Sequence, residues 1–170
     1  MRLFSGKIPT IAQEVVTTLS AAQDIETEAP NEVALDIESV LKEYLRAERR
    51  VVDEAKTRME SRGMSYGELG RVKSQVAREM KIPIGEDTLP YLIDQILEML
   101  FHSSHVAEVF AEDAGLRKKV TTILRRHMDV EAELDKEVRS KIKNLEEGTA
   151  AFETEYQKTL DSLKRTKRLT

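Results

Sequence analysis

Apolar residues recur every three or four positions along two long intervals of the chain, which is the pattern of a helix with one buried stripe. The intervals are residues 31–62 and 116–147, and each has 32 residues without glycine or proline. Each interval predicts a helix of about 30 residues, ~48 Å long at 1.5 Å per residue. Because strand-like alternation is nearly absent, the predicted fold class is all-α: a helical bundle with two long helices and several shorter ones.

Shorter helices are predicted where glycine, proline and N-cap residues divide the rest of the chain. In chain order they are a helix near residues 8–20, one from the Ser65 cap to about Met80, one after Asp87 or Thr88, a short one from Ser104 through Phe110, and a final one after Thr149.

The two halves of the chain are similar in the order and length of these helices. Laying residue 31 on residue 114, an offset of 83, brings the long helices into register, so that Val40-Leu41 falls on Ile123-Leu124. Any two amphipathic helices match in part by period alone, but the matching order favours an internal duplication. The predicted halves are residues 1–83 and residues 84–170, the second with a short basic C-terminal tail.

Composition excludes several classes of protein. Of the 170 residues, 34% are charged and 40% hydrophobic, which fits neither a disordered tail nor a membrane protein. No apolar run approaches the ~18 residues of a membrane span, so we expect a cytoplasmic protein without a membrane partner. The absence of cysteine excludes disulfides, thiolate metal sites and cysteine nucleophiles. A net charge of −4 gives no global reason to bind nucleic acid.

No motif indicates catalysis. Gly63, Gly67 and Gly70 lack both the Walker lysine-serine ending and a preceding strand, so they favour a helix C-cap and a loosely packed helix start. No strand-turn-helix elbow is predicted that would expose a nucleophile. We therefore expect a protein that is not an enzyme, with no catalytic residue and no cofactor.

Histidines offer the only weak sign of a metal site. Glu98, His102 and His105 are spaced by four and three residues, so on one continuous helix they would share a face. Ser103-Ser104 between them indicates a helix break, which favours polar residues at a helix junction instead. His127 lies beside the second apolar stripe, where an interfacial, hydrogen-bonded histidine is favoured over a catalytic base.

Opposite charges gather at corresponding places of the two halves. The acidic stretch, residues 24–38, contains no base, and the basic stretch, residues 114–128, contains no acid. The two stretches either are solvated faces or meet, within a chain or across a dimer, and set orientation more than affinity. The candidate interaction residues are Asp24, Glu26, Glu28, Glu32 and Asp36 on the acidic side, and Arg117, Lys118, Lys119, Arg125 and Arg126 on the basic side.

The end of the chain is also basic. Four bases follow Ser162 without an acid. They suit phosphate contacts in a nucleic acid, but they also suit a frayed, soluble C-terminus, because bases in a last turn complement the helix dipole. The absence of interleaved aromatic residues favours the second interpretation. The four candidates are Lys164, Arg165, Lys167 and Arg168.

Several runs of the sequence are distinctive, among them His-Ser-Ser-His-Val-Ala-Glu-Val-Phe-Ala-Glu-Asp; the runs are residues 1–9, 36–45, 98–100, 102–113, 134–145 and 155–158. Together they resemble a bacterial family known as domain of unknown function 507. This resemblance extends over nearly the whole chain and implies a soluble, helical bacterial protein. It implies no activity, cofactor or catalytic residue.

Two helices of ~48 Å in so small a chain leave few residues to cover both apolar stripes, so a partner chain is the natural cover. We predict a non-enzymatic protein–protein interaction or structural module that forms a homo-oligomer or binds a protein partner. The alternative is a nucleic-acid or ribosome-associated protein that uses residues 117–126 and the C-terminal tail.

Overall fold

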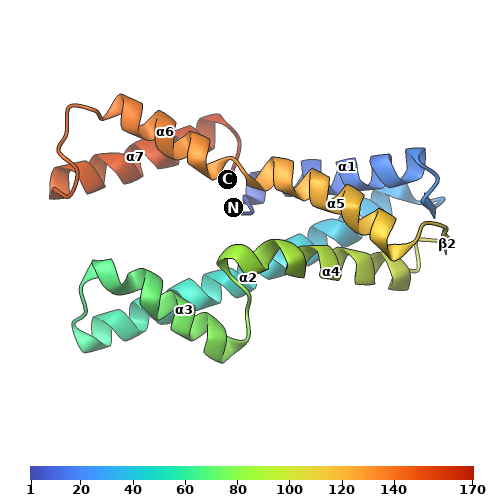
Figure 1. The fold of residues 1–170 in the computed structure, drawn as a ribbon, viewed down its shortest axis with the longest axis horizontal. Coiled ribbons are helices and arrows are strands. Elements are labelled where there is room, and N and C mark those ends of the chain that lie inside the picture. Colours follow the sequence, from blue (N-terminus) through green and yellow to red (C-terminus); the bar gives the residue numbers. More distant parts are fainter.

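Helices form most of the chain in the computed structural model, which describes residues 1–170 (Figure 1). Three single-turn 3-10 helices, Ser5–Lys7, Tyr66–Glu68 and Gly85–Asp87, lead into α1, α3 and α4. The predicted all-α class is confirmed. The elements are α1 (Ile8–Ala21), β1 (Ile25–Glu26), α2 (Pro30–Arg62), α3 (Leu69–Met80), α4 (Thr88–His102), β2 (Glu108–Val109), α5 (Asp113–Met128), α6 (Glu131–Lys141) and α7 (Ala150–Thr166).

The first predicted long helix is present as α2, an unbroken helix of 33 residues. Pro30 opens it in the first turn, where a missing N–H costs no hydrogen bond. Gly63 ends it with a φ of 61°, a left-handed conformation that glycine adopts without the Cβ clash of other residues. The pattern of residues 31–62 therefore predicted both the existence and the bounds of this helix.

The prediction of a second long helix is wrong, because residues 116–147 form two helices. α5 ends at Met128, and α6 begins at Glu131 and ends already at Lys141. The N-terminal segment crosses the chain at the break: Arg2 N–H donates to the Met128 carbonyl at 3.1 Å, and the Met1 amino group lies 3.4 Å from the Glu131 carboxylate. A carbonyl at a helix end needs such an outside partner once the helix stops.

The prediction of a short helix from Ser104 through Phe110 is also wrong, because this segment is a turn followed by β2. β2 pairs antiparallel with β1, with Ile25 opposite Val109 and Glu26 opposite Glu108. Phe110 N–H extends the ladder by donating to the Asp24 carbonyl at 2.8 Å. The main-chain groups are thus satisfied across the ribbon and not within a helix.

The order of elements repeats at the predicted offset. β1 and β2 begin at residues 25 and 108, and α2 and α5 begin at residues 30 and 113, so both pairs are 83 residues apart. In the ribbon, the first residue of each strand faces the second residue of the other, as a pseudo-twofold axis between the halves requires. This arrangement supports the predicted duplication.

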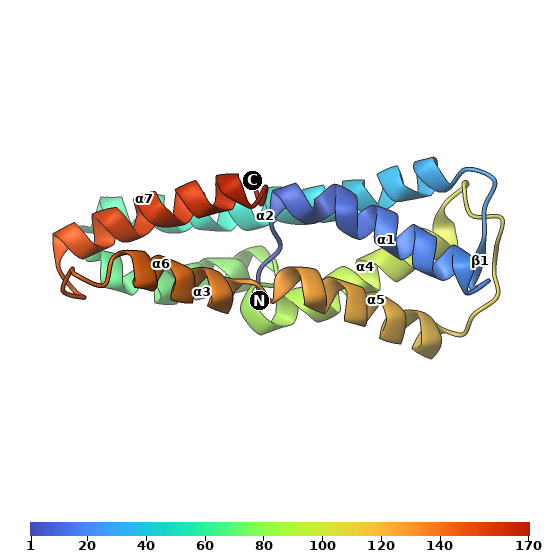
Figure 2. The ribbon, with the colours of Figure 1, turned by 90° about the horizontal axis from the view of Figure 1, so that it is seen from above.

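The main core is built jointly by the two halves. α1, the first part of α2, α4 and α5 pack into a four-helix body, seen from two directions in Figures 1 and 2. The division at residue 83 stays a prediction about the sequence, since both sides of it fill this one core. The largest fully buried side chains are Ile8, Ile11, Leu19, Ile37, Leu41, Leu92, Ile96, Leu100, Leu116, Leu124 and Met128.

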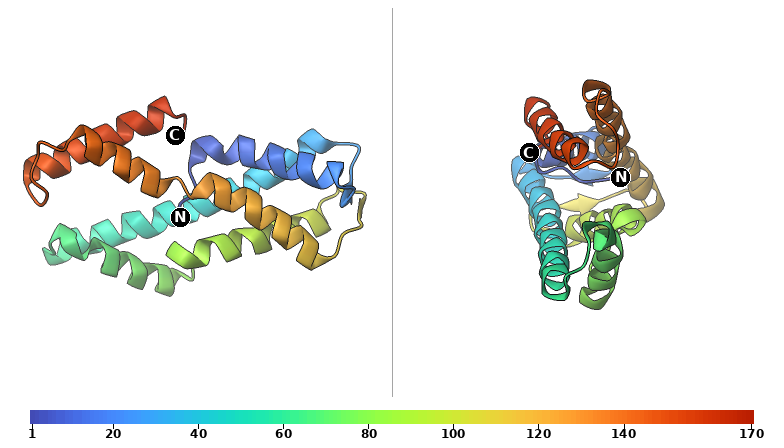
Figure 3. Two further views of the ribbon diagram at one scale, coloured as in Figure 1. Left: turned by 45° about the horizontal axis from the view of Figure 1, so that its top comes forward. Right: turned by 90° about the vertical axis from the view of Figure 1, so that its left-hand side faces the viewer.

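Two helical hairpins project from the body at the end opposite the β1–β2 ribbon (Figures 1 and 3). Arm 1, residues 48–81, is the second part of α2 with α3, and arm 2, residues 131–169, is α6 with α7. The chain termini lie where the arms leave the body (Figure 2). Each arm has its own small core: Val51, Ala55, Met59, Val72, Val76 and Ala77 in arm 1, and Leu134, Val138, Ile142, Phe152, Leu163 and Leu169 with Phe4 in arm 2. None of the helices combines the length and apolar character that crossing a bilayer requires.

Candidate interaction surfaces

The acidic and basic stretches meet at one ion pair inside the chain. Lys119 Nζ lies 2.5 Å from the Asp24 carboxylate, and Asp24 is only 9% exposed. The other bases pair elsewhere: Arg117 bonds Asp94 at 2.5 Å and Asp113 at 2.8 Å, and Arg126 contacts Glu14 on α1. The stretches therefore do not face each other along their length.

Asp36 of the acidic stretch has a different partner. Its carboxylate accepts a hydrogen bond of 2.7 Å from the Ser103 hydroxyl, which ties α2 to the residue that ends α4. Lys118 and Arg125 are exposed and form no ion pair.

A cluster of free carboxylates surrounds the β1–β2 ribbon. We call it the acidic end; its members are exposed and form no ion pair within the chain, and they are Glu26, Glu28, Glu32, Glu108 and Glu112. Phe110 stands among them with 63% of its surface exposed. A hollow of about 660 Å³ beside Phe110 is lined by Ser20, whose buried hydroxyl has no hydrogen-bond partner.

The three residues of the weak metal candidate do not form a ligand set. α4 ends at His102, whose Nδ1 lies 2.8 Å from the Glu98 carbonyl one turn earlier. Ser103 has an extended backbone, as the predicted break requires, and places His105 beyond the helix in a turn. No three histidine or acidic side chains of the structure lie close enough together to hold a metal ion.

His127 lies between α5 and α1, where its Nε2 is 2.5 Å from the Glu14 carboxylate. Burial is the main cause that lowers the pKa of His127 from its ordinary 6.5, and the charges of Arg126 and Lys7 lower it further. Because an ionised carboxylate only accepts, Nε2 of His127 is the donor to Glu14. This is the interfacial role that the sequence predicted.

Tyr44 occupies the place in the first half that corresponds to His127. Its hydroxyl lies 2.8 Å from the Thr88 hydroxyl, 3.0 Å from the Pro83 carbonyl oxygen and 3.3 Å from the Glu48 carboxylate, so its one proton has acceptors close by. Burial raises the pKa of Tyr44 to about 12. The hydroxyl therefore remains protonated and fixes α2 against the start of α4.

The basic C-terminal residues are docked and not frayed. α7 continues to Thr166, and Lys167 pairs with Glu137 of α6 at 3.0 Å. Lys164 Nζ lies 5.8 Å from the centre of the Phe4 ring, and burial lowers its pKa. Arg165 and Arg168 are exposed and have no acidic partner, so these two are the bases that remain free.

The N-terminal segment holds arm 2 to the body, a role that no sequence pattern predicted. Gly6 N–H donates to the Leu169 carbonyl at 2.8 Å. A Cβ added at Gly6 would lie 2.1 Å from the Arg168 carbonyl oxygen, so only glycine permits this approach.

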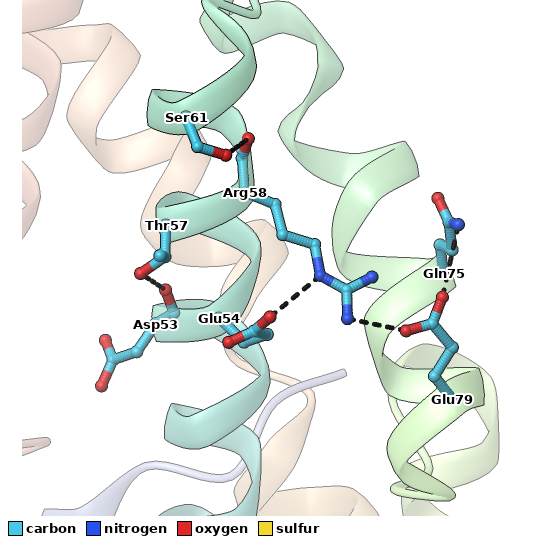
Figure 4. A network of polar contacts seen from close by, with 7 residues as sticks. All are labelled: Asp53, Glu54, Thr57, Arg58, Ser61, Gln75 and Glu79. Carbon is cyan, nitrogen blue, oxygen red and sulfur yellow. Dashed lines mark hydrogen bonds and ion pairs between the residues drawn. The ribbon is translucent and has the colours of Figure 1, made fainter.

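Arm 1 is fastened by Arg58, which reaches from α2 to α3 (Figure 4). Its Nε lies 2.9 Å from Glu54 and its Nη2 lies 2.7 Å from Glu79 of α3. These hydrogen bonds raise the pKa of Arg58 and lower that of Glu79. At the tip, Tyr66 is 76% exposed, more than any other large apolar side chain of the protein.

Arm 2 has a corresponding set of polar contacts around Arg139. Arg139 lies 3.0 Å from Asp135 and 3.1 Å from Glu147, and its guanidinium lies over the Phe152 ring at 5.7 Å. The Tyr156 hydroxyl donates to Asp135 at 2.5 Å, and burial followed by this bond raises the pKa of Tyr156 to about 12. Both arms therefore have polar ties of their own in addition to their cores.

These features define a class of small all-helical proteins in which two hairpin arms leave one four-helix body. Residues 1–169 match the model of a family described as "Protein of unknown function (DUF507)", and the chain belongs to this family. The search of curated proteins found no match.

Proposed function

We propose that this chain is a non-enzymatic protein–protein interaction module that grips a partner with its two arms. The observation that carries the proposal is that both arms leave the same end of the body while each keeps its own core and polar ties. Two arms fixed on one body present two contacts to one partner, and the second contact then forms at a high effective concentration.

Tyr66 is the anchor at the tip of arm 1. No side chain of the protein covers it, and exposed aromatic residues supply much of the binding energy where they enter a partner's pocket. Tyr66 begins the short 3-10 helix Tyr66–Glu68 that follows the turn at the end of α2, while Met64 of that turn packs against the core of arm 1.

A nucleic-acid partner is the second candidate. Lys118, Arg125, Arg165 and Arg168 are exposed and form no ion pair, so they are available to phosphates. Arg117, Lys119, Arg126 and Lys167 are engaged within the chain, which leaves about half of the predicted contacts. For this reason the protein partner is favoured.

The test compares two matched aromatic variants in a cross-linked pull-down from cells in which the chain is native. Tyr66→Ser alters the tip of arm 1, and Phe110→Ser alters another largely exposed aromatic residue at the opposite end of the molecule. We expect the first variant to lose the partner and the second to retain it, with no release by nuclease. Retention by both variants would contradict the role of arm 1.

Nucleic-acid binding is measured separately at two salt concentrations. Release of the partner by nuclease, with binding that weakens steeply as salt rises, would favour the second candidate. Removing residues 162–170 is not a clean version of this test, because it deletes Leu163 and Leu169 from the core of arm 2. Arg165→Gln with Arg168→Gln removes the free charges and leaves that core intact.

A further inference from the structure

An open groove runs over the body between α2 and α4. It consists of two adjoining hollows of about 410 and 440 Å³, which share Ser39 and Val40. The two helices lie antiparallel along it, as the contacts from Asp36 to Ser103 and from Tyr44 to Thr88 show. Its apolar lining includes Val40, Ala47, Ile82, Tyr91 and Met99.

One stripe of α2 lies along this groove, and its only polar contacts in the chain are the hydrogen bond from Ser103 to Asp36 and the exposed pair of Glu43 with Arg46. It is distinct from the buried stripe of the same helix and steps by four, three, four and three residues, the spacing of a coiled-coil seam. From residue 36 to residue 50 it is ~21 Å long at 1.5 Å per residue. The stripe is Asp36, Val40, Glu43, Ala47 and Arg50.

The corresponding surface in the other half is closed. α5 and α1 stand there in place of α2 and α4, and Ile123, the counterpart of Val40, is buried. When Ile11, Val15 and Leu19 of α1 are laid on Leu92, Ile96 and Leu100 of α4, Glu14 falls on Gln95. Glu14 bonds both Arg126 and His127. Of the two related grooves, therefore, only the one between α2 and α4 remains apolar and open.

We propose that a second copy of this chain covers the groove, with the two α2 helices antiparallel about a twofold axis near Ala47. A twofold interface requires a patch that complements itself. Glu43 and Arg50 stand on opposite sides of Ala47, so Glu43 of each protomer comes beside Arg50 of its partner. The small side chain of Ala47 lets the two helices approach closely at the axis.

The monomer leaves these groups available. Arg50 is exposed and forms no ion pair, and Glu43 pairs only with Arg46, which is exposed as well. Such an exposed pair contributes little, so Glu43 exchanges partners at small cost. Tyr91, 37% exposed above Tyr44, is buried by the incoming helix. The groove runs from the body to the base of arm 1, where Arg50 and Ile82 line it. The dimer rests on the proposed function and extends it, because each dimer carries two pairs of arms.

Sedimentation velocity over the micromolar range at low salt tests the dimer with charge-reversal variants. Glu43→Arg and Arg50→Glu each place like charges together twice, so each raises the dissociation constant at least tenfold. Mixing the two variants pairs opposite charges again, and the double variant does the same within one chain. We expect both to recover most of the wild-type affinity.

Lys158→Glu is the matched control, because it reverses an exposed charge on α7 away from the groove and leaves the dissociation constant unchanged. Far-ultraviolet circular dichroism checks that every variant is folded. A wild-type chain that stays monomeric throughout would overturn the proposal, as would single variants that dimerise like wild type or a mixture without recovery. A monomer that still captures a partner through Tyr66 rejects the dimer alone and leaves the proposed function standing.

Discussion

Replacing Gly6 with alanine tests how arm 2 is held to the body. The added Cβ would lie 2.1 Å from the Arg168 carbonyl oxygen and 2.6 Å from the Leu169 carbonyl carbon. Both are main-chain atoms, so no side-chain rotation relieves the overlap. The N-terminal segment and residues 168–169 must therefore move apart in Gly6→Ala.

The cost follows from the contacts that this separation breaks. The hydrogen bond from Gly6 N–H to the Leu169 carbonyl contributes ~1 kcal/mol. Phe4 and Leu169, 4% and 3% exposed, each contribute about 1.5–3 kcal/mol when fully buried, and a partial exposure loses part of that. Alanine also restricts the unfolded chain, which returns only ~0.4–1 kcal/mol. We expect a net destabilisation of arm 2 of about 2–4 kcal/mol.

Amide hydrogen exchange followed by mass spectrometry measures this effect segment by segment. We expect faster exchange in residues 1–7 and 131–169 of Gly6→Ala, with exchange in the four-helix body little changed. Gly115→Ala is the control, because no atom lies within 4 Å of its added Cβ and alanine favours the helix there. If Gly6→Ala exchanged like wild type, the docking of arm 2 by the N-terminal segment would be wrong.

Three further predictions concern single contacts of the body and arm 2. The pKa of His127 is lowered in the folded protein, so near and below pH 6.5 the unfolded chain binds more protons than the folded chain. The free energy of unfolding therefore decreases as the pH falls through 6.5. Urea titrations at several pH values should show this decrease, and His127→Gln should make it smaller. Tyr44→Phe removes the hydroxyl that bonds Thr88 and leaves the buried Thr88 hydroxyl with fewer hydrogen-bond partners. We expect the free energy of unfolding, measured in urea, to decrease by about 1–2 kcal/mol. Thr149 caps α7 by accepting from Phe152 N–H at 3.2 Å, so Thr149→Ala should cost ~1 kcal/mol and speed amide exchange in the first turn of α7, whereas Thr149→Ser should not.

The hydrophobic pattern predicted α2 well because glycine and proline mark both of its ends. The break between α5 and α6 has no such residue, and the N-terminal segment that contacts it lies about 130 positions away in the sequence. One local sign was present: the stripe loses its spacing of three and four between Met128 and Leu134, where it steps by six. The two-residue strands are too short to produce a recognisable alternation.

The candidate surfaces were predictable only in part. The correspondence of the halves brought the acidic and basic stretches to one end of the body, and Asp24 and Lys119 do meet there. The acidic partner of each other base depends on how α4 and α5 cross. The pairing of Arg117 with Asp94 was therefore not predictable from the sequence. The same holds for Gly6, whose role depends on contacts with residues 168 and 169 at the other end of the chain.

Amide hydrogen exchange of the chain bound to its captured partner tests the proposed function most directly. If the arms grip the partner, protection increases at the tip of arm 1 around residues 60–70 and in arm 2, while the acidic end keeps the exchange rates of the free protein. Protection confined to residues 24–32 and 107–113, with both arms unchanged, would contradict the account and place the binding surface at the β1–β2 ribbon.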